Sequence, residues 1–174
     1  MFPALLILNA GSSTLKFAIH ARGPGGDAPV ARGLVDAIGR DARFRLLTGG
    51  DADGHDVAVA AADHAQALEH VLGWLDARHP DLPLHAAGHR IVHGGADYTV
   101  PVRVDARVLA DLEKLIPLSP LHQPHGLAGI RALARLRPAL PQVACFDTAF
   151  HHTLPPHARR FALPREFEAR GIRR

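Results

Sequence analysis

The stretch Ala4-Leu5-Leu6-Ile7-Leu8-Asn9-Ala10-Gly11-Ser12-Ser13-Thr14-Leu15-Lys16 decides how this chain begins to fold. Its first five residues form a continuous apolar run, which is typical of a short buried strand. Gly and Ser residues then interrupt the run, and residues 15–20 resume a pattern that predicts a second strand. The stretch is therefore expected to form a β-hairpin with a polar tip.

The rest of the chain alternates predicted strands and helices. Strands are expected at residues 30–38, 43–47, 56–60, 86–92 and 142–146, with a Gly- and Pro-rich loop at 22–29 and a turn at 48–54. Apolar side chains recur on one face at the spacing of a helix in residues 63–78, 105–116 and 126–136. Residues 151–156 are expected to be a loop, and residues 164–170 a short helix. Consecutive strands followed by helical crossovers predict an α/β fold with a mixed sheet.

Composition excludes several classes of protein. The 174 residues, 47% of them hydrophobic, can bury the core of one domain and begin another. No apolar run reaches the ~20 residues of a membrane helix and no signal peptide is apparent, so we expect a cytoplasmic protein without a membrane partner. The single cysteine, Cys145, cannot form an internal disulfide. Basic residues are scattered and aromatics are few, so we expect no nucleic-acid partner.

The tip of the predicted hairpin carries groups that suit a phosphate. Small residues let backbone N–H groups approach the ligand, Ser12 and Thr14 offer hydroxyls, and Lys16 offers an ammonium group. The chain has 20 basic residues, of which Lys16 and Lys114 are the lysines, so Lys16 either marks a required ammonium or is a coding accident. The tip is not a Walker P-loop, because a strand follows it. An ordinary polar turn is the alternative interpretation.

Residues 88–95, Gly-His-Arg-Ile-Val-His-Gly-Gly, place Arg90 and Val92 on one face of a predicted strand. A guanidinium beside an apolar side chain suits a small acid that has a carboxylate at one end and a methyl group at the other. An arginine that pairs with a carboxylate at the strand end is the alternative. His89 and His93, on the other face, are interpreted as structural histidines, because no Cys or Glu completes a metal-ligand set.

Two later segments each carry one polar side chain whose position the local structure should fix. Residues 117–125 form a proline-framed loop in which His122 can donate a hydrogen bond to developing negative charge; a capping or solvent-exposed histidine is the alternative. Residues 143–151 form an apolar strand that ends at Asp147. Ligands gather at the carboxyl ends of strands in open sheets, although a turn-forming aspartate is also common there.

Taken in order, these four segments resemble the acetate kinase family over residues 5–174. The resemblance implies the fold shared by acetate and sugar kinases, heat-shock chaperone ATPases and actin, in which a ribonuclease-H-like mixed β-sheet is flanked by helices. It implies that residues 1–150 are the first of two domains, on the acetate and phosphate side. Residues 151–174 would begin a second, nucleotide-binding domain that is truncated in this sequence, and we therefore expect the chain to be inactive alone.

The resemblance also implies a reaction: reversible, Mg²⁺- or Mn²⁺-dependent phosphoryl transfer between ATP and acetate, giving ADP and acetyl phosphate. The roles it assigns are Asn9 for the metal; Ser12, Thr14 and Lys16 for the phosphates; Arg90, Val92 and Leu121 for acetate; and His122 and Asp147 for catalysis. Full-length relatives are expected to be homodimers. The alternatives are a propionate or butyrate kinase, a non-catalytic module that binds carboxylates or phosphates, and a partner of a full-length kinase.

Two considerations refine these expectations. Acetate has a pKa near that of Glu, ~4.3, so it is already ionised at neutral pH and needs no base. Asp147 is therefore expected to orient acetate or Mg²⁺-bound water rather than to remove a proton. The family usually has asparagine where this chain has Gln123, and a small residue and asparagine where it has His125 and Gly126, and these departures raise the question of how His122 is placed.

Overall fold

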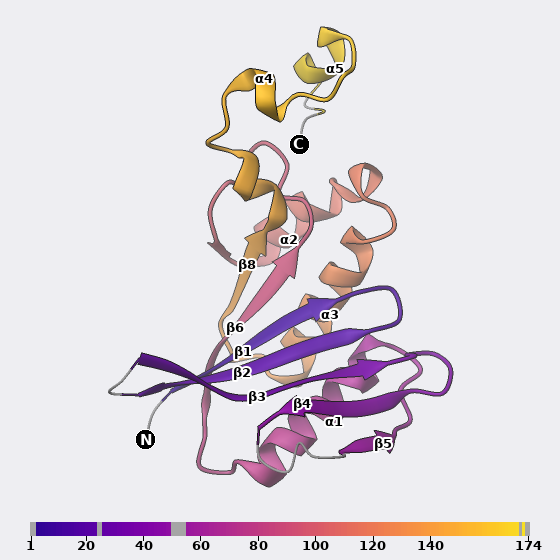
Figure 1. Cartoon of the computed structure of the whole chain (residues 1–174), viewed down its shortest axis with the longest axis vertical. Coiled ribbons are helices and arrows are strands. Elements are labelled where there is room, and N and C mark those ends of the chain that lie inside the picture. The colour runs from indigo at the N-terminus through magenta and orange to yellow at the C-terminus, as the bar shows by residue number, and fades with distance from the viewer. Residues whose placement is uncertain (1–2, 24–25, 50–54, 171, 173–174) are drawn as a thin grey trace.

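The structure is a computed structural model that describes residues 3–23, 26–49, 55–170 and 172. Its strands are β1 (Ala4–Ala10), β2 (Leu15–Gly23), β3 (Gly26–Asp36), β4 (Arg43–Thr48), β5 (Asp56–Ala58), β6 (Leu84–Ile91), β7 (Val102–Arg103) and β8 (Gln142–Phe146). Its helices are α1 (His64–Arg78), α2 (Ala106–Glu113), α3 (Gln123–Leu136), α4 (Pro156–Arg159) and α5 (Arg165–Ala169), with short 3₁₀ helices η1 (Ile116–Leu118) and η2 (Asp147–His151). The predicted mixed α/β architecture is confirmed (Figure 1).

The sheet has eight strands in the order β5-β4-β3-β2-β1-β6-β8-β7. The hairpin of β1 and β2 begins an antiparallel series that continues through β3, β4 and β5. On its other side, β1 pairs in parallel with β6, and β6 pairs in parallel with β8. Because β1, β6 and β8 are parallel, their carboxyl ends lie at one edge of the sheet, and the residues that follow them are brought together.

The hydrophobic core lies between the sheet and helices α1, α2 and α3, which cover one face of it. Along β1, Leu6 and Leu8 are buried beneath the helices, whereas Ile7 points to the other face and is 41% exposed. This alternation is the two-residue period of a strand whose two faces differ. Each such buried leucine contributes about 1.5–3 kcal/mol to folding. Helix α1 begins as predicted, because the Asp63 side chain accepts a hydrogen bond from the backbone N–H of Gln66.

Several sequence expectations are corrected. Residues 22, 23 and 26–29, expected to be part of a loop, instead continue β2 and β3 as a paired ribbon that projects from the sheet (Figure 1), and residues 24–25 lie outside the described residues. A register shift between Ile19 and His20 places Pro29 opposite His20, and such a bulge accommodates a proline that cannot donate to the ladder. The two-residue edge strand β7 was not predicted, since it is too short to show a pattern. Residues 50–54 of the expected turn lie outside the described residues.

Helix boundaries also differ from the expected ones. Helix α3 begins at Gln123, three residues before the predicted start, since the first turn of a helix tolerates Pro124. Helix α2 ends at Glu113 and is followed by a 3₁₀ turn. After β8, the segment from η2 through α4 and α5 lies beyond one end of the sheet (Figure 1). Among the described residues, no helix is long and apolar enough to span a membrane.

Candidate functional site

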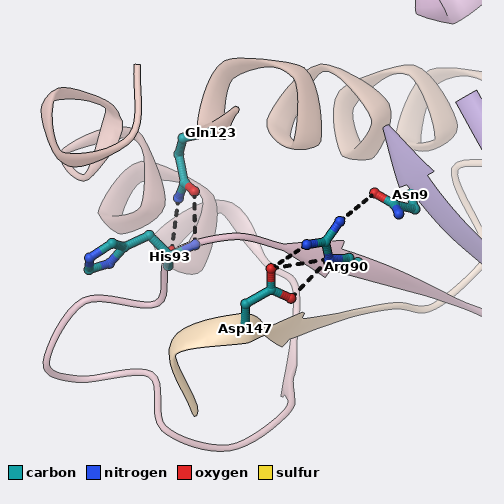
Figure 2. A network of polar contacts seen from close by, with 5 residues as sticks. All are labelled: Asn9, Arg90, His93, Gln123 and Asp147. Atoms are coloured by element: carbon teal, nitrogen blue, oxygen red, sulfur yellow. Dashed lines mark hydrogen bonds and ion pairs between the residues drawn. The ribbon is translucent and has the colours of Figure 1, made fainter. Parts of the chain in front are cut away.

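Three polar side chains from three adjacent strands meet at the carboxyl edge of the sheet (Figure 2). Asn9 lies near the end of β1, Arg90 lies near the end of β6, and Asp147 directly follows β8. Arg90 Nη1 donates to Asn9 Oδ1 over a long 3.4 Å, so Arg90 links the side chains on either side of it. The parallel order β1-β6-β8 is what brings these three residues together, although they are far apart in the sequence.

The strongest contact at this edge joins Arg90 to Asp147. Arg90 Nε lies 2.9 Å from Oδ1 and Nη2 lies 2.6 Å from Oδ2, which is the two-pronged geometry that guanidinium and carboxylate groups prefer. The hydrogen bonds that Arg90 donates to the Asp147 carboxylate raise the pKa of Arg90 above its usual value. Both side chains are about half exposed, so the pair contributes about 1 kcal/mol or less to stability. Its effect is chiefly to fix the direction of the guanidinium.

A cavity of about 200 Å³ opens beside this cluster. The hairpin tip supplies Asn9 and Gly11 to its wall, the end of β6 supplies Arg90 and Val92, and the segment that begins α3 supplies His122. Val92 lies one residue beyond the strand rather than within it. Two larger hollows, of about 810 and 530 Å³, lie around the loop between α3 and β8, at the opposite end of β6 and β8. Four of the predicted site residues line the smaller cavity, so it is the candidate functional site.

Gln123 anchors the start of α3 against the end of β6. Its side chain is 1% exposed, and its Oε1 accepts from the backbone N–H of His93 at 3.3 Å. Its Nε2 donates to the carbonyl oxygens of His93, at 3.0 Å, and Leu112, at 3.3 Å. Figure 2 shows the two contacts with His93. The longer glutamine side chain thus has its own set of backbone partners, and it fixes the position of the adjacent His122. Sequence reasoning noted Gln123 only as a departure from the family.

The hairpin tip is held by contacts that local patterns do not show. The backbone N–H of Gly11 donates to the carbonyl of Thr14 at 2.8 Å, which closes the turn. The carbonyl oxygen of Gly11 lies 2.6 Å from Nε2 of His64. Because a carbonyl oxygen can only accept a hydrogen bond, Nε2 of His64 is the donor and carries the proton. The Thr14 hydroxyl donates to Asp36 Oδ1 at 2.8 Å and lowers the pKa of that carboxyl group. Neither His64 nor Asp36 was singled out from the sequence.

The structure therefore gathers some of the predicted site residues and leaves others outside. Asn9, Arg90, Val92 and His122 line the cavity, and Asp147 contacts Arg90 at its edge. The remaining four do not line it: Ser12, Thr14, Lys16 and Leu121. Ser12 and Lys16 are exposed near the hairpin tip, and the Thr14 hydroxyl is already committed to Asp36. Leu121 is 75% exposed, so nothing in this arrangement places it against a substrate methyl group.

His89 has the structural role that the sequence indicated. It is buried beneath the helices, and its Nε2 lies 2.7 Å from the amide of Gln142. With the amide oriented so that its nitrogen donates both to His89 and to the carbonyl of Ile130, every polar atom of Gln142 has a suitable partner. Burial lowers the pKa of His89 to about 4, so the imidazole is neutral at pH 7. His89 is therefore a core residue.

Fold and site together define the class of protein. A mixed sheet whose parallel strands β1, β6 and β8 direct polar residues to one edge is the architecture of the acetate and sugar kinase, heat-shock chaperone and actin class. The crystal structure of Porphyromonas gingivalis acetate kinase superposes with a TM-score of 0.84 at 34% identity, covering 99% of this chain and 44% of that one. A propionate kinase from Francisella tularensis superposes with a TM-score of 0.82 at 31% identity, covering 98% of this chain and 44% of that one.

Sequence comparisons give the family. The acetate kinase of Rhodopseudomonas palustris (strain CGA009) is 43% identical over 177 residues, which cover 100% of this chain and 44% of the relative. That of Pseudarthrobacter chlorophenolicus is 45% identical over 171 residues, covering 98% and 42%. The family model described as the acetokinase family matches residues 4–174, and the chain belongs to this family. It spans less than half the length of these curated relatives.

Proposed function

We propose that this chain forms the acetate side and part of the phosphate side of an acetate kinase, which transfers a phosphoryl group reversibly between ATP and acetate. The observation that carries the proposal is the cavity that Asn9, Arg90, Val92 and His122 line together. It has room for several water molecules of ~30 Å³ each, so the four heavy atoms of acetate fit within it. The proposed location is the cytoplasm.

The geometry of Arg90 indicates how acetate would be held. Asp147 occupies the Nε and Nη2 edge of the guanidinium, whereas Nη1 makes a long contact with Asn9, which lines the cavity together with Arg90. An acetate oxygen would accept from Nη1, and the methyl group would rest against Val92. In this arrangement Asp147 acts as a positioning group for Arg90, which agrees with the expectation that acetate needs no base.

The remaining chemical task is to reduce the repulsion between anions. Acetate, the transferred phosphoryl group and ADP are all negatively charged, so catalysis depends on positioning and on electrostatic stabilisation. His122 would donate a hydrogen bond to the phosphoryl oxygens from the cavity wall, and Arg90 would offset the charge of acetate. Lys16 and Ser12, exposed at the hairpin tip, would approach the phosphates from outside the cavity. Thr14 would first have to release Asp36.

A divalent ion fits this site as a partner of the nucleotide. The described residues contain no group of three or more His, Cys, Asp or Glu side chains that would hold a metal by themselves. Mg²⁺ is commonly held by one or two protein oxygens together with substrate phosphates and water. The Asn9 amide oxygen would supply one ligand, and the ion would neutralise phosphate charge.

A second candidate substrate is propionate. The solved propionate kinase superposes nearly as well as the acetate kinase, and Val92 forms one side of a cavity that also opens toward solvent. One extra methylene changes selectivity by only about 10- to 200-fold in such pockets. The two acids should therefore be compared in every assay.

The test is an acetyl phosphate assay with ATP and Mg²⁺. The chain would be assayed alone and with a separately expressed segment that corresponds to the rest of a full-length relative. We expect no product from the chain alone and measurable product after complementation, which Arg90→Ala abolishes. Activity of the isolated chain would contradict the proposed division of the site. A folded, complemented pair without activity on acetate or propionate would contradict the enzymatic proposal and favour a non-catalytic binding module.

A further inference from the structure

A groove of about 530 Å³ lies near the start of β8, at the opposite end of this strand from the candidate site. The β7–α2 connection forms one wall, the second half of α3 forms another, and the loop between α3 and β8 closes the end. It is more than twice the volume of the cavity beside Arg90. No step of the proposed phosphoryl transfer uses it.

Three arginines line the groove. Arg103 comes from β7, and Arg131 and Arg135 come from successive turns of α3. Arg131 pairs with Glu113, but within the described part of the chain neither Arg103 nor Arg135 has an ion-pair partner. Solvated surface arginines are common, so the informative feature is that these arginines line one groove. The groove has an excess of positive charge.

The acidic residue of the lining does not cancel this excess. Asp105 is the N-cap of α2, and its Oδ1 accepts a hydrogen bond from the backbone N–H of Val108 at 2.8 Å. That oxygen stabilises the first turn of its own helix. Glu113 offsets the charge of Arg131, and Asp105 offsets one of the other two arginines, so the groove keeps an excess of one positive charge. This excess favours an anion, and a guanidinium fork favours a carboxylate or phosphate in particular.

The lining between the charged groups is apolar. Leu109 and Leu140 are partly buried and leave apolar surface accessible in the groove, whereas Ile130 in its wall is already buried. Burying further apolar surface there contributes about 25 cal/mol per Å². A ligand that satisfies the whole groove therefore has a carboxylate at one end and an apolar body larger than that of acetate.

We infer that this groove is a second binding site, specific for an amphipathic carboxylate with an aromatic or branched body. The site is distinct from the candidate acetate cavity and is independent of the proposed kinase activity. Helix α3 lines both hollows, with Gln123 and Gly126 at the cavity and Arg131 and Arg135 at the groove.

The experiment is a titration of the isotope-labelled chain with phenylbutyrate, followed by two-dimensional amide NMR spectra. We expect saturable binding with a Kd of about 1 mM, the value for a ligand of about a dozen heavy atoms at modest efficiency. The shifted amides should lie around Arg103, Arg135 and Leu140. Phenylbutanol, which has the same body without the charge, should bind about tenfold more weakly.

Matched variants test the arginines. Each of Arg103→Gln and Arg135→Gln should weaken binding about threefold, and the double variant about tenfold. Arg107→Gln is the control, because Arg107 is an exposed arginine of α2 outside the groove. Unchanged affinity in the folded double variant, equal binding of the alcohol, or shifts confined to Asn9 and Arg90 would overturn the inference. Displacement of phenylbutyrate by the separately expressed complementing segment would also overturn the inference. That result would mean that the groove is where this chain contacts the complementing segment.

Discussion

Replacing Gln123 with alanine tests how the candidate site is held in place. Its side chain is 1% exposed and makes three hydrogen bonds, all to backbone groups of His93 and Leu112. The substitution leaves these backbone groups without their partner and opens a small cavity between α3 and the end of β6. Both effects act at the wall that carries His122.

The magnitude follows from these contacts. A net hydrogen bond contributes about 1 kcal/mol, and a buried group left unpaired costs about 1–3 kcal/mol. Two of the three hydrogen bonds are long, at 3.3 Å, so for each backbone group left unpaired we expect a cost in the lower part of this range of about 1–3 kcal/mol. With the lost packing, Gln123→Ala should lower the free energy of unfolding by about 2–4 kcal/mol, a large share of the ~5–15 kcal/mol typical of a domain.

The assay is urea denaturation followed by circular dichroism. Gln66→Ala is the matched control, because Gln66 is an exposed glutamine whose Oε1 accepts one hydrogen bond, from the backbone N–H of Ala62. The control should lose about 1 kcal/mol or less. Gln123→Asn, which restores the residue usual in the family, should lose less than Gln123→Ala. A loss below about 0.5 kcal/mol for Gln123→Ala would refute the anchoring role.

Three further predictions concern other parts of the molecule. The pKa of His89 is about 4 in the folded chain against ~6.5 unfolded, so the unfolded state binds more protons between these values. Stability should fall by up to about 3 kcal/mol as pH drops from 6.5 to 4, and urea titrations of His89→Gln should lack this component of the slope. Gly94→Ala should destabilise the fold by about 1–3 kcal/mol in thermal melts, because the added Cβ would lie 2.4 Å from a backbone oxygen. Gly73→Ala is the contrasting variant: its added Cβ would have nothing within 4 Å, so it should stabilise α1 by about 0.5–1 kcal/mol. Asp147→Asn should change unfolding by less than about 1 kcal/mol because the pair is half exposed, yet abolish product in the complemented assay; retained activity would exclude the positioning of Arg90 by Asp147.

The parts of the fold that the sequence predicted are those governed by local patterns. The hairpin, α1 and β8 follow from apolar runs and from Gly, Ser and Asp residues that interrupt or cap them. The ribbon formed by residues 22–23 and 26–29 was missed because its pairing comes from backbone hydrogen bonds, to which Gly and Pro composition is a poor guide. Strand β7 depends on its neighbour β8, so its two residues carry no signal of their own.

The candidate site shows the same division. Arg90 lies near the end of a recognisable strand and Asp147 follows another, so their positions at the carboxyl edge of the sheet could be predicted. The alternative interpretation of Arg90, an arginine paired with a carboxylate, describes the contact between the two residues. The contacts from His64 to Gly11 and from Thr14 to Asp36 join residues 53 and 22 positions apart, and no local pattern encodes them. Leu121 is exposed here, and its contact with a methyl group, which the family resemblance implied, stays a prediction.

The central claim is that the cavity beside Arg90 binds acetate. An NMR titration of the isotope-labelled chain with acetate measures this directly, with Arg90→Ala as the test variant and the exposed Arg40→Ala as the control. The account predicts shifts of the amides of Gly11, Arg90 and His122 in the unmodified chain and in the control, and their loss in Arg90→Ala. Shifts that persist unchanged in a folded Arg90→Ala chain, or that appear only outside the cavity, would contradict it.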